Sequence, residues 1–432
     1  MSYNQDILSG QGEFIFPAVR PLYDKPLVLK EGQGVRVRDV AGREYLDLFA
    51  GILTTSVGHC NPKVVARMSE QLAKLGHTST LYVTEAQVEA AGLLASIAPG
   101  QLSQTFFTNS GTEAIESAIQ MAFVHTGRSE VIGLRQSYHG RSFMTSNLTA
   151  VGSWRPLATS FPGIKHVQTP YPYRCPYKQP CDESCSEKFA MDIEDVIRTT
   201  TNGEPAAFIA EPVMGVGGYI VPPKGYFERA AEIIRSYGGL FISDEVQSGF
   251  GRSGDHWFGI EHSGVEPDIM VMAKGIANGA PVGAMTTRPE IAESWTAKTI
   301  STFGGNPISM AAASATMEVM IEENVPQRAS EQGSQLLAGL RKLQNHFDWI
   351  GDVRGRGLML GLELVENGEK KKPFPAKASG LLAACKEEGL LVGIGGLHDH
   401  VIRLGPSLLV TPSEIEEGLE KFGRACHKLE GR

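Results

Sequence analysis

Short apolar runs alternate with longer helical patterns through the middle of the chain, and this alternation constrains the fold more than any other feature. Runs of four or five mostly apolar residues are typical of strands that are buried on both faces of a sheet. The pattern therefore predicts an α/β fold whose mostly parallel central sheet is covered by helices. The runs lie at residues 104–107, 130–134, 207–210, 240–243 and 269–273, and helical patterns include 62–75, 112–125 and 226–237.

A smaller α+β domain is expected after this region. Two long helical patterns are followed by strand patterns at 357–365 and 401–410, with a helical pattern at 413–429 that opens on Ser-x-x-Glu, the sequence of a capping box. Near the other end of the chain, residues 34–49 alternate apolar and polar side chains around Ala41-Gly42, as in a β-hairpin. We expect three parts: an N-terminal segment packing with the small domain (1–60), a large domain (61–310) and the C-terminal small domain (311–432).

Composition limits the partners and the compartment. The chain has 40 basic and 48 acidic residues, a net charge of −8 and no long run of either sign, which argues against nucleic acid and anionic membrane as partners. No stretch approaches the roughly 18 apolar residues of a membrane span. The first sixteen residues hold no Lys or Arg, and six scattered cysteines are not a secreted disulfide framework. We expect a cytoplasmic protein.

Polar residues stand where the first apolar runs end. Ser110, Gly111 and Thr112 lie between a run and a helix, where free N–H groups and the helix dipole suit a phosphate, although a plain helix cap is a common alternative. Tyr138 and His139 follow the next run and could stack on a planar ring or simply form a turn.

Charged residues end two further runs. Asp244 at a buried strand end needs a partner, which could be a metal, a basic residue or a protonated ring nitrogen. Lys274 loses hydration there, which would lower its pKa and provide the neutral amine of Schiff-base chemistry, unless the side chain reaches solvent. Because the carboxyl ends of parallel strands meet at one edge, these groups form one expected site. Phosphate site, aromatic ring, acid and amine together are the parts that hold pyridoxal phosphate.

Ordered motifs from about residue 27 to residue 429 resemble those of class III pyridoxal-phosphate aminotransferases, the group of 4-aminobutyrate, ornithine and mitochondrial-type alanine–glyoxylate enzymes. The resemblance implies fold type I, pyridoxal 5'-phosphate as cofactor, and a homodimer with active sites at the subunit interface; pairing into tetramers is left open. The motifs are Ser-Val-Gly-His-Cys-Asn-Pro (56–62), Ser-Gly-Thr-Glu-Ala (110–114), Tyr-His-Gly (138–140), Ala-Glu-Pro (210–212), Asp-Glu-Val-Gln (244–247), Ala-Lys-Gly (273–275), Thr-Phe-Gly-Gly-Asn-Pro (302–307) and Gly-Asp-Val-Arg-Gly-Arg-Gly-Leu-Met (351–359).

The resemblance also implies roles for single residues. Lys274 matches the Schiff-base lysine and Asp244 the partner of the pyridine nitrogen. Arg403 matches the arginine that binds the substrate α-carboxylate, and Glu211 the acid that can pair with that arginine when an ω-amino donor is present. The remaining residues matched to the cofactor are Gln247 near the ring hydroxyl, its neighbour Val246, Tyr138 or His139 as ring stacker, Ser110, Gly111 and Thr112 at the phosphate, and Thr302 reaching the phosphate from the other subunit.

The expected reaction moves an amino group from an ω-amino acid or alanine to pyruvate, glyoxylate or 2-oxoglutarate by ping-pong kinetics. Arg141 after Tyr-His-Gly resembles 4-aminobutyrate enzymes, in which an arginine there can bind a second carboxylate, whereas the motifs at 56–62 and 351–359 look closest to the alanine–glyoxylate branch. A phospho-lyase, an aminomutase and a non-catalytic pyridoxal-phosphate-binding protein are alternatives on the same scaffold.

Two other patterns in the sequence suggest different chemistry. Cys175, Cys181 and Cys185 form Cys-x5-Cys-x3-Cys, for which a zinc or iron–sulfur site shared across a dimer is conceivable, but the spacing fits no standard finger and favours free thiols, so no metal is expected. The glycines of residues 355–361 resemble a dinucleotide fingerprint with the wrong spacing and no following helix, which makes a Rossmann dehydrogenase a weak reading.

Overall fold

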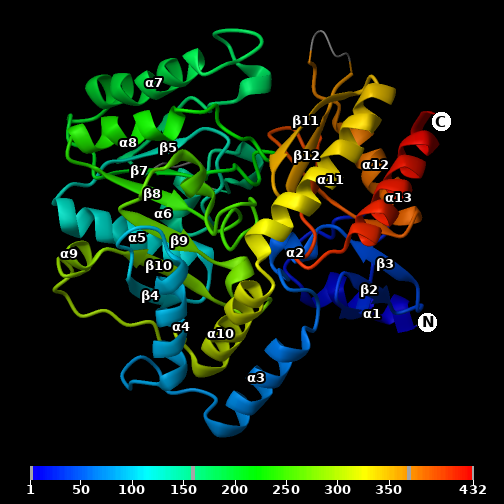
Figure 1. Cartoon of the computed structure of the whole chain (residues 1–432), viewed down its shortest axis with the longest axis horizontal. Helices are drawn as coiled ribbons and strands as arrows, with labels where there is room; N and C mark the ends of the chain where they lie inside the picture. The colour runs from blue at the N-terminus through cyan, green and yellow to red at the C-terminus, as the bar shows by residue number, and fades with distance from the viewer. Residues whose placement is uncertain (1–2, 157–160, 367–370, 431–432) are drawn as a thin grey trace.

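The computed structural model describes residues 3–156, 161–366 and 371–430, and its strands form three sheets (Figure 1). The largest has seven strands, and two sheets of four strands each lie on the other side of the molecule in this view. No helix among the described residues is long and apolar enough to cross a membrane. The division at residues 60 and 310 stays a prediction.

The seven-stranded sheet is mostly parallel, as the apolar runs predict. Its strands are β4 (Gln104–Thr108), β5 (Val131–Leu134), β6 (Ile164–Val167), β7 (Ala207–Ala210), β8 (Leu240–Asp244), β9 (Ile269–Met272) and β10 (Gly283–Thr287). Their order is β4-β10-β9-β8-β7-β5-β6, and only β10 runs antiparallel to its neighbours within this described sheet. The parallel strands therefore all end at the same edge.

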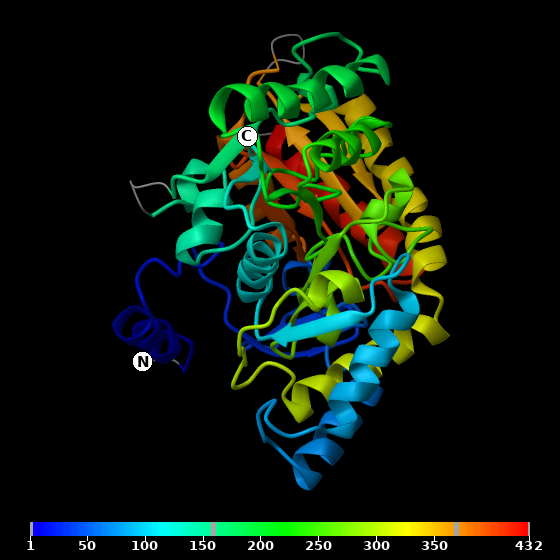
Figure 2. The same cartoon turned by 90° about the vertical axis from the view of Figure 1, so that its left-hand side faces the viewer.

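Helices cover both faces of this sheet (Figure 2). Alternate residues of β7 show the two-residue period of a strand: Phe208 and Ala210 pack in the core beneath α7 and α8, whereas Ala207 and Ile209 pack in the core beneath α5. This burial on both sides explains why the strand reads as an uninterrupted apolar run. The helices around the sheet are α5 (Gly111–Thr126), α6 (Phe143–Leu148), α7 (Ser184–Thr200), α8 (Tyr226–Ser236) and α9 (Pro289–Ala292).

The small sheets join the two ends of the chain. In one, β3 pairs with β13, so residues near the N-terminus share a sheet with residues near the C-terminus. The first sheet consists of β1 (Leu29–Gln33), β2 (Arg36–Asp39), β3 (Glu44–Asp47) and β13 (Leu390–Leu391), and the second of β11 (Ile350–Arg356), β12 (Met359–Leu364), β15 (Val401–Leu404) and β14 (Gly393–Gly395). The strand predicted over 401–410 ends at Leu404, because Pro406 has no N–H with which to continue the ladder.

The remaining helices pack around these sheets. Helix α10 contacts α3 and α4 beside the large sheet. Helices α11 and α12 each contact both α13 and the second small sheet. These helices are α3 (Pro62–Lys74), α4 (Glu85–Ile97), α10 (Pro307–Glu322), α11 (Val325–His346), α12 (Pro375–Glu387) and α13 (Pro412–Glu430). Shorter elements are α1 (Tyr3–Phe14), α2 (Ala50–Leu53) and the 3-10 turns η1 (Gly152–Trp154), η2 (Pro172–Arg174), η3 (Gly259–Ser263) and η4 (Lys274–Ala277).

Candidate active site

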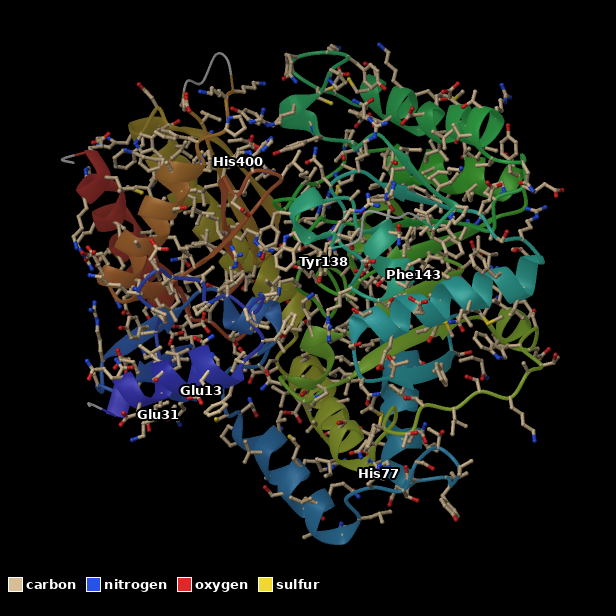
Figure 3. All side chains as sticks on the ribbon, turned by 180° about the vertical axis from the view of Figure 1, so that it is seen from behind. Glu13, Glu31, His77, Tyr138, Phe143 and His400 are labelled. Carbon is tan, nitrogen blue, oxygen red and sulfur yellow. The ribbon has the colours of Figure 1, made fainter. Side chains whose placement is uncertain are left out.

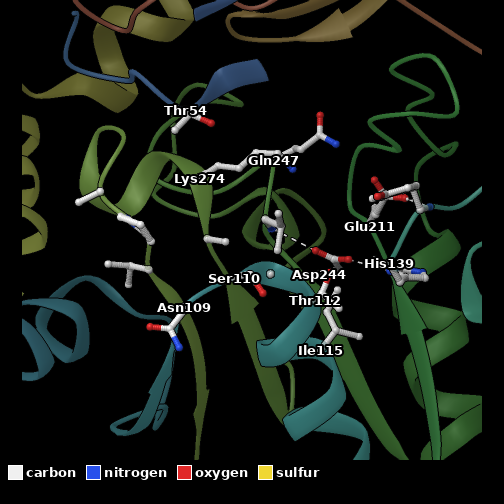
Figure 4. A pocket seen from close by; sticks show the side chains of 18 of the residues that line it. Thr54, Asn109, Ser110, Thr112, Ile115, His139, Glu211, Asp244, Gln247 and Lys274 are labelled. Carbon is white, nitrogen blue, oxygen red and sulfur yellow. Dashed lines mark hydrogen bonds and ion pairs between the residues drawn. The ribbon is translucent and has the colours of Figure 1, made fainter. Parts of the chain in front are cut away.

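A cavity of about 310 Å³ opens at the carboxyl edge of the large sheet (Figure 4). Its walls come from the segments that follow five strands, β4, β5, β7, β8 and β9, which is the edge where parallel sheets bind ligands. The sequence-predicted residues in its lining are Ser110, Gly111, Thr112, Tyr138, His139, Glu211, Asp244, Val246, Gln247 and Lys274. The fold therefore brings together the groups that stand apart in the sequence.

The N-terminus of α5 forms one wall. Ser110 caps this helix, since its Oγ accepts the N–H of Glu113 at 3.2 Å. The N–H groups of Gly111 and Thr112, in the first turn, have no acceptor within the helix and could bind an anion together with the helix dipole. Gly111 is small for a reason: a Cβ there would lie 3.2 Å from Val246 Cγ2. The wall therefore suits a phosphate group.

Asp244 ends β8 and is held in place on both carboxylate oxygens. Its Oδ2 lies 2.7 Å from His139 Nδ1, and its Oδ1 accepts the N–H of Val246 at 3.1 Å. Burial lowers the pKa of His139, but the hydrogen bond and charge of Asp244 and the charge of Glu211 outweigh it, so the pKa is raised. His139 Nε2 is buried and has no partner among the described residues.

Glu211, directly after β7, is a second buried carboxyl group in the cavity. It accepts the N–H of Tyr138 at 2.9 Å and that of Gly215 at 2.8 Å. Burial and the negative charge of Asp244 raise its pKa to about 7, against the opposing effects of His139 and the two N–H donors. Two buried carboxyl groups in one cavity favour the binding of a positively charged group there.

Lys274 follows β9 with a backbone φ of 47°, in the left-handed region that non-glycine residues rarely adopt. Strained backbone of this kind gathers at functional sites. Burial lowers the pKa of Lys274 to about 8, partly offset by the charges of Asp244 and Glu211. Its amine makes no hydrogen bond or ion pair within the described chain, and Lys274 lines the cavity.

Gln247 completes this group, because its Oε1 is buried without a partner in the described structure. A phosphorylated pyridine ring with a hydroxyl and a carbonyl group needs polar partners for each of these groups. The cavity offers the N-terminus of α5, the carboxylate of Asp244, the free amine of Lys274, and the unpaired atoms of Gln247 and His139. The residues present therefore fit pyridoxal phosphate, the cofactor that the sequence predicts at this edge of the sheet.

Arg403 does not line the cavity and lies next to Gly215. Its Nε donates to the C=O of Ile394 at 3.1 Å and its Nη1 to the C=O of Gly215 at 3.3 Å, while Phe49 and Tyr219 present their rings to the guanidinium at 5.2 and 5.6 Å. Glu211 and Arg403 therefore bind the N–H and the C=O of the same residue, Gly215, without an ion pair between them in the described structure.

Two expected residues lie further away. Arg141 and Thr302 are exposed and stand outside the lining of the cavity. Tyr138 does line it, with its ring edge-on to Trp154 at 5.5 Å, and Figure 3 shows Tyr138 between the two sides of the molecule. Both rings line the cavity, and His139 is also hydrogen-bonded to Asp244.

Sequence reasoning missed part of the lining. Thr54 directly follows α2, and Asn109 and Ile115 flank the predicted phosphate wall. Residues 279–282, Gly-Ala-Pro-Val, follow the left-handed Asn278, whose side chain bonds the N–H of Val57 and the C=O of Gly58. The Asn-Gly pair at 278–279 is a turn signal that could have indicated this loop beside Lys274.

Comparisons with known proteins point the same way. The chain matches the family model described as Aminotransferase class-III over residues 19–426. It is 41% identical over 424 residues to alanine–glyoxylate aminotransferase 2 homolog 2, mitochondrial, of Arabidopsis thaliana, covering 98% of this chain and 87% of that protein. The (S)-enantioselective ω-transaminase from Thermomicrobium roseum matches with a TM-score of 0.91 and 31% identity over 99% of both chains. The ω-transaminase from Pseudomonas jessenii in complex with PMP matches with a TM-score of 0.89 and 28% identity, over 94% of this chain and 93% of that one.

Proposed function

The chain belongs to the class III aminotransferase family, and on that premise we propose that it transfers the amino group of an ω-amino acid or alanine to pyruvate, glyoxylate or 2-oxoglutarate. It is a transaminase of fold type I, and pyridoxal phosphate is its cofactor. The observation that supports the proposed roles most is the meeting of Lys274, Asp244 and the N-terminus of α5 in one cavity.

When bound, pyridoxal phosphate supplies an electron sink for the carbon that carries the amino group. The N–H groups of Gly111 and Thr112 would hold its phosphate, and Gln247 would donate to its ring hydroxyl. Asp244, oriented by His139, would stabilise a proton on its ring nitrogen. The ring of Tyr138 would pack against its face.

Lys274 would attach the cofactor and later move the proton. Its pKa of about 8 makes a sizeable neutral fraction available near neutral pH, so Nζ can take the proton from the substrate carbon and return it. Arg403 would bind the substrate α-carboxylate with its guanidinium, which Gly215 and the rings of Phe49 and Tyr219 hold in place.

We also propose that two subunits form the site. Thr302 would reach the phosphate of the partner subunit, and exposed apolar side chains beside it support an interface: Phe303 is 60% exposed and Val83 91% exposed. The ring centroids of His77 and Phe303 are 5.0 Å apart, so the segment that contains Phe303 lies beside the segment that contains His77 (His77 is labelled in Figure 3).

Co-expression of Lys274→Ala with Thr302→Ala tests the shared site. It should restore activity that neither variant has alone, because a mixed dimer keeps one intact site.

A donor-by-acceptor panel tests the reaction. With donor alone, the enzyme should convert one equivalent of donor per site to the oxo product, and an acceptor should restore turnover. Release of ammonia without acceptor would instead support a phospho-lyase, and an isomer of the donor an aminomutase.

Arg141 tests the substrate class. Arg141→Ala should weaken donors or acceptors with a second carboxylate by about 10-fold or more, the loss of one charge-assisted contact, and leave alanine nearly unchanged. Arg155→Ala, which removes a different arginine that also stands outside the cavity lining, is the control. Equal loss for all substrates would contradict the assignment.

A further inference from the structure

Three cysteines outside the active site come together at the start of α7. Cys175 follows η2, Cys181 lies in the loop, and Cys185 is in the first turn of the helix. Their sulfur atoms all lie within 4.8 Å of one another, and none forms a disulfide. Cys175 and Cys185 are buried, whereas Cys181 is partly accessible. The sequence spacing alone favours free thiols, but the fold collects them into one compact group.

The size of the group fits one thiophilic ion. Zn–S bonds of about 2.3 Å place two sulfurs of a tetrahedral site about 3.8 Å apart, which small side-chain rotations can reach from the present separations. An iron–sulfur cluster usually takes four cysteines, bound to different irons and therefore spread more widely. Among the described residues this group offers three cysteines, so a single ion with one further ligand is the better match.

The surrounding backbone supports a thiolate at Cys175. Backbone N–H groups of Lys178 and Tyr177 point at its sulfur, and the sulfurs of Cys181 and Cys185 lie beside it. Hydrogen bonds of this kind orient the ligands of metal sites. The loop is closed by Gln179, whose Nε2 donates to the C=O of Pro172 at 3.2 Å and of Cys175 at 3.1 Å.

We propose that Cys175, Cys181 and Cys185 bind one Zn²⁺ ion as thiolates, with the fourth position open to solvent beside Cys181. Binding displaces the three thiol protons to solvent and involves no change of redox state. The site fixes the loop to α7, and that loop carries Tyr171 and Arg174 to Glu363 of β12, where Arg174 Nε lies 2.7 Å from Oε1. The ion would thus stabilise a contact between the large sheet and a small one, independently of the substrate.

Metal content of the full-length holoenzyme tests the proposal. Protein prepared anaerobically with reductant, loaded with Zn²⁺ and desalted should retain about one zinc per chain by elemental mass spectrometry, the stoichiometry of a single site. Cys181→Ser, at the most accessible of the three positions, should lose most of it, and the triple serine variant all of it. Cys60→Ser, an exposed cysteine elsewhere, should retain it.

Cobalt loading gives a second readout that does not depend on how the serine variants fold. Co²⁺ should produce a thiolate-to-metal charge-transfer band in the wild-type enzyme and in Cys60→Ser. No retained zinc and no cobalt band in the wild type would overturn the proposal. So would equal zinc in the wild type and the triple variant, or a disulfide between two of the three cysteines in the anaerobic protein.

Discussion

Asp244 and Glu363 are both buried carboxylates in charged surroundings, yet their surroundings differ in kind. Glu363 is met by two arginines, Arg174 at 2.7 Å and Arg354 at 2.8 Å, with the ring of His400 at 3.3 Å and the hydroxyl of Tyr171 beside them. Burial raises the pKa of Glu363, but these partners outweigh it and hold the pKa well below its ordinary value. This cluster satisfies its acid from within the chain.

The Asp244 cluster is left incomplete. It holds a second carboxyl group, Glu211, whose pKa is raised to about 7, and an amine, Lys274, whose pKa is lowered to about 8. Buried atoms without partners occur in both clusters, but those of His139 and Gln247 belong to residues that line the cavity. The difference teaches that burial of charge does not mark a functional site by itself. What marks it is unpaired charge facing a cavity, whereas the paired charge of Glu363 stabilises the fold.

Removal of the Lys274 amine should distinguish the two clusters most clearly, because it should abolish activity without lowering stability. Lys274→Ala should lower kcat/KM by about 10⁴-fold or more, because both the covalent attachment and the proton transfer are lost. The melting temperature of the apoenzyme should stay unchanged or rise, since a buried, partnerless amine is removed. Steady-state kinetics and thermal unfolding measure the two effects, and a large loss of stability with residual activity would break the distinction.

Neutralisation of Glu363 should have the opposite effect, lowering stability without lowering activity. Glu363→Gln leaves Arg174 without its anion and Arg354 with Asp352 alone, and should cost about 3–5 kcal/mol of unfolding free energy, with kcat/KM of the folded enzyme nearly unchanged. Urea unfolding measures the loss. Glu366→Gln is the matched control, because Glu366 is exposed and its surface pair with Lys372 should contribute less than about 1 kcal/mol. Similar losses from both variants would show that the buried cluster has no special role.

The partner of Asp244 should have an intermediate effect. His139→Ala removes the hydrogen bond at Asp244 Oδ2 and should weaken pyridoxal-phosphate binding about 10–100-fold, the range for a hydrogen bond to a charged group. Cofactor titration of the apoenzyme measures it. His166→Ala, a partly buried histidine bonded to the C=O of Leu148 instead, is the control and should bind the cofactor normally. Unchanged affinity in His139→Ala would remove His139 from the site.

The two clusters should also differ in how they respond to pH, and this effect is smaller than those of the substitutions. Only the neutral Lys274 amine captures the cofactor, so the capture rate of the apoenzyme should fall about tenfold per pH unit below about 8 and level off above it. Glu363, whose pKa is lowered in the folded state, contributes stability above its unfolded pKa and loses it only as the pH falls through the lower folded value. Its contribution should be constant from pH 6 to 9. Stopped-flow absorbance and urea unfolding test both, and a flat capture rate would contradict the lowered pKa.

The sequence predicts the central strands well, because residues such as those of β7 are apolar on both faces. It misses β10, Gly-Ala-Met-Thr-Thr, and β6, Ile-Lys-His-Val, whose mixed composition gives no such signal. The last helix is capped by Thr411 and Glu414, which exchange hydrogen bonds, rather than by the predicted Ser-x-x-Glu two residues later. Equivalent capping patterns overlap here, and local sequence does not choose between them.

Within the site, the sequence identifies the residue types at the strand ends but not how they pair. The bond between His139 and Asp244 joins residues 105 positions apart, and the sequence gives no sign of it. Glu363 gives no signal at all, because its strand reads as apolar and its partners lie as far as 192 residues away. The three cysteines likewise become a group only through the loop that folds them together.

The most direct measurement is to locate the cofactor's attachment. Borohydride reduction of the holoenzyme fixes the carbonyl carbon of pyridoxal phosphate to the amine that holds it, and peptide mapping by mass spectrometry identifies that amine. The account predicts the label on Lys274, lost in Lys274→Ala. A label on another lysine, or none on the peptide that contains Lys274, would contradict it.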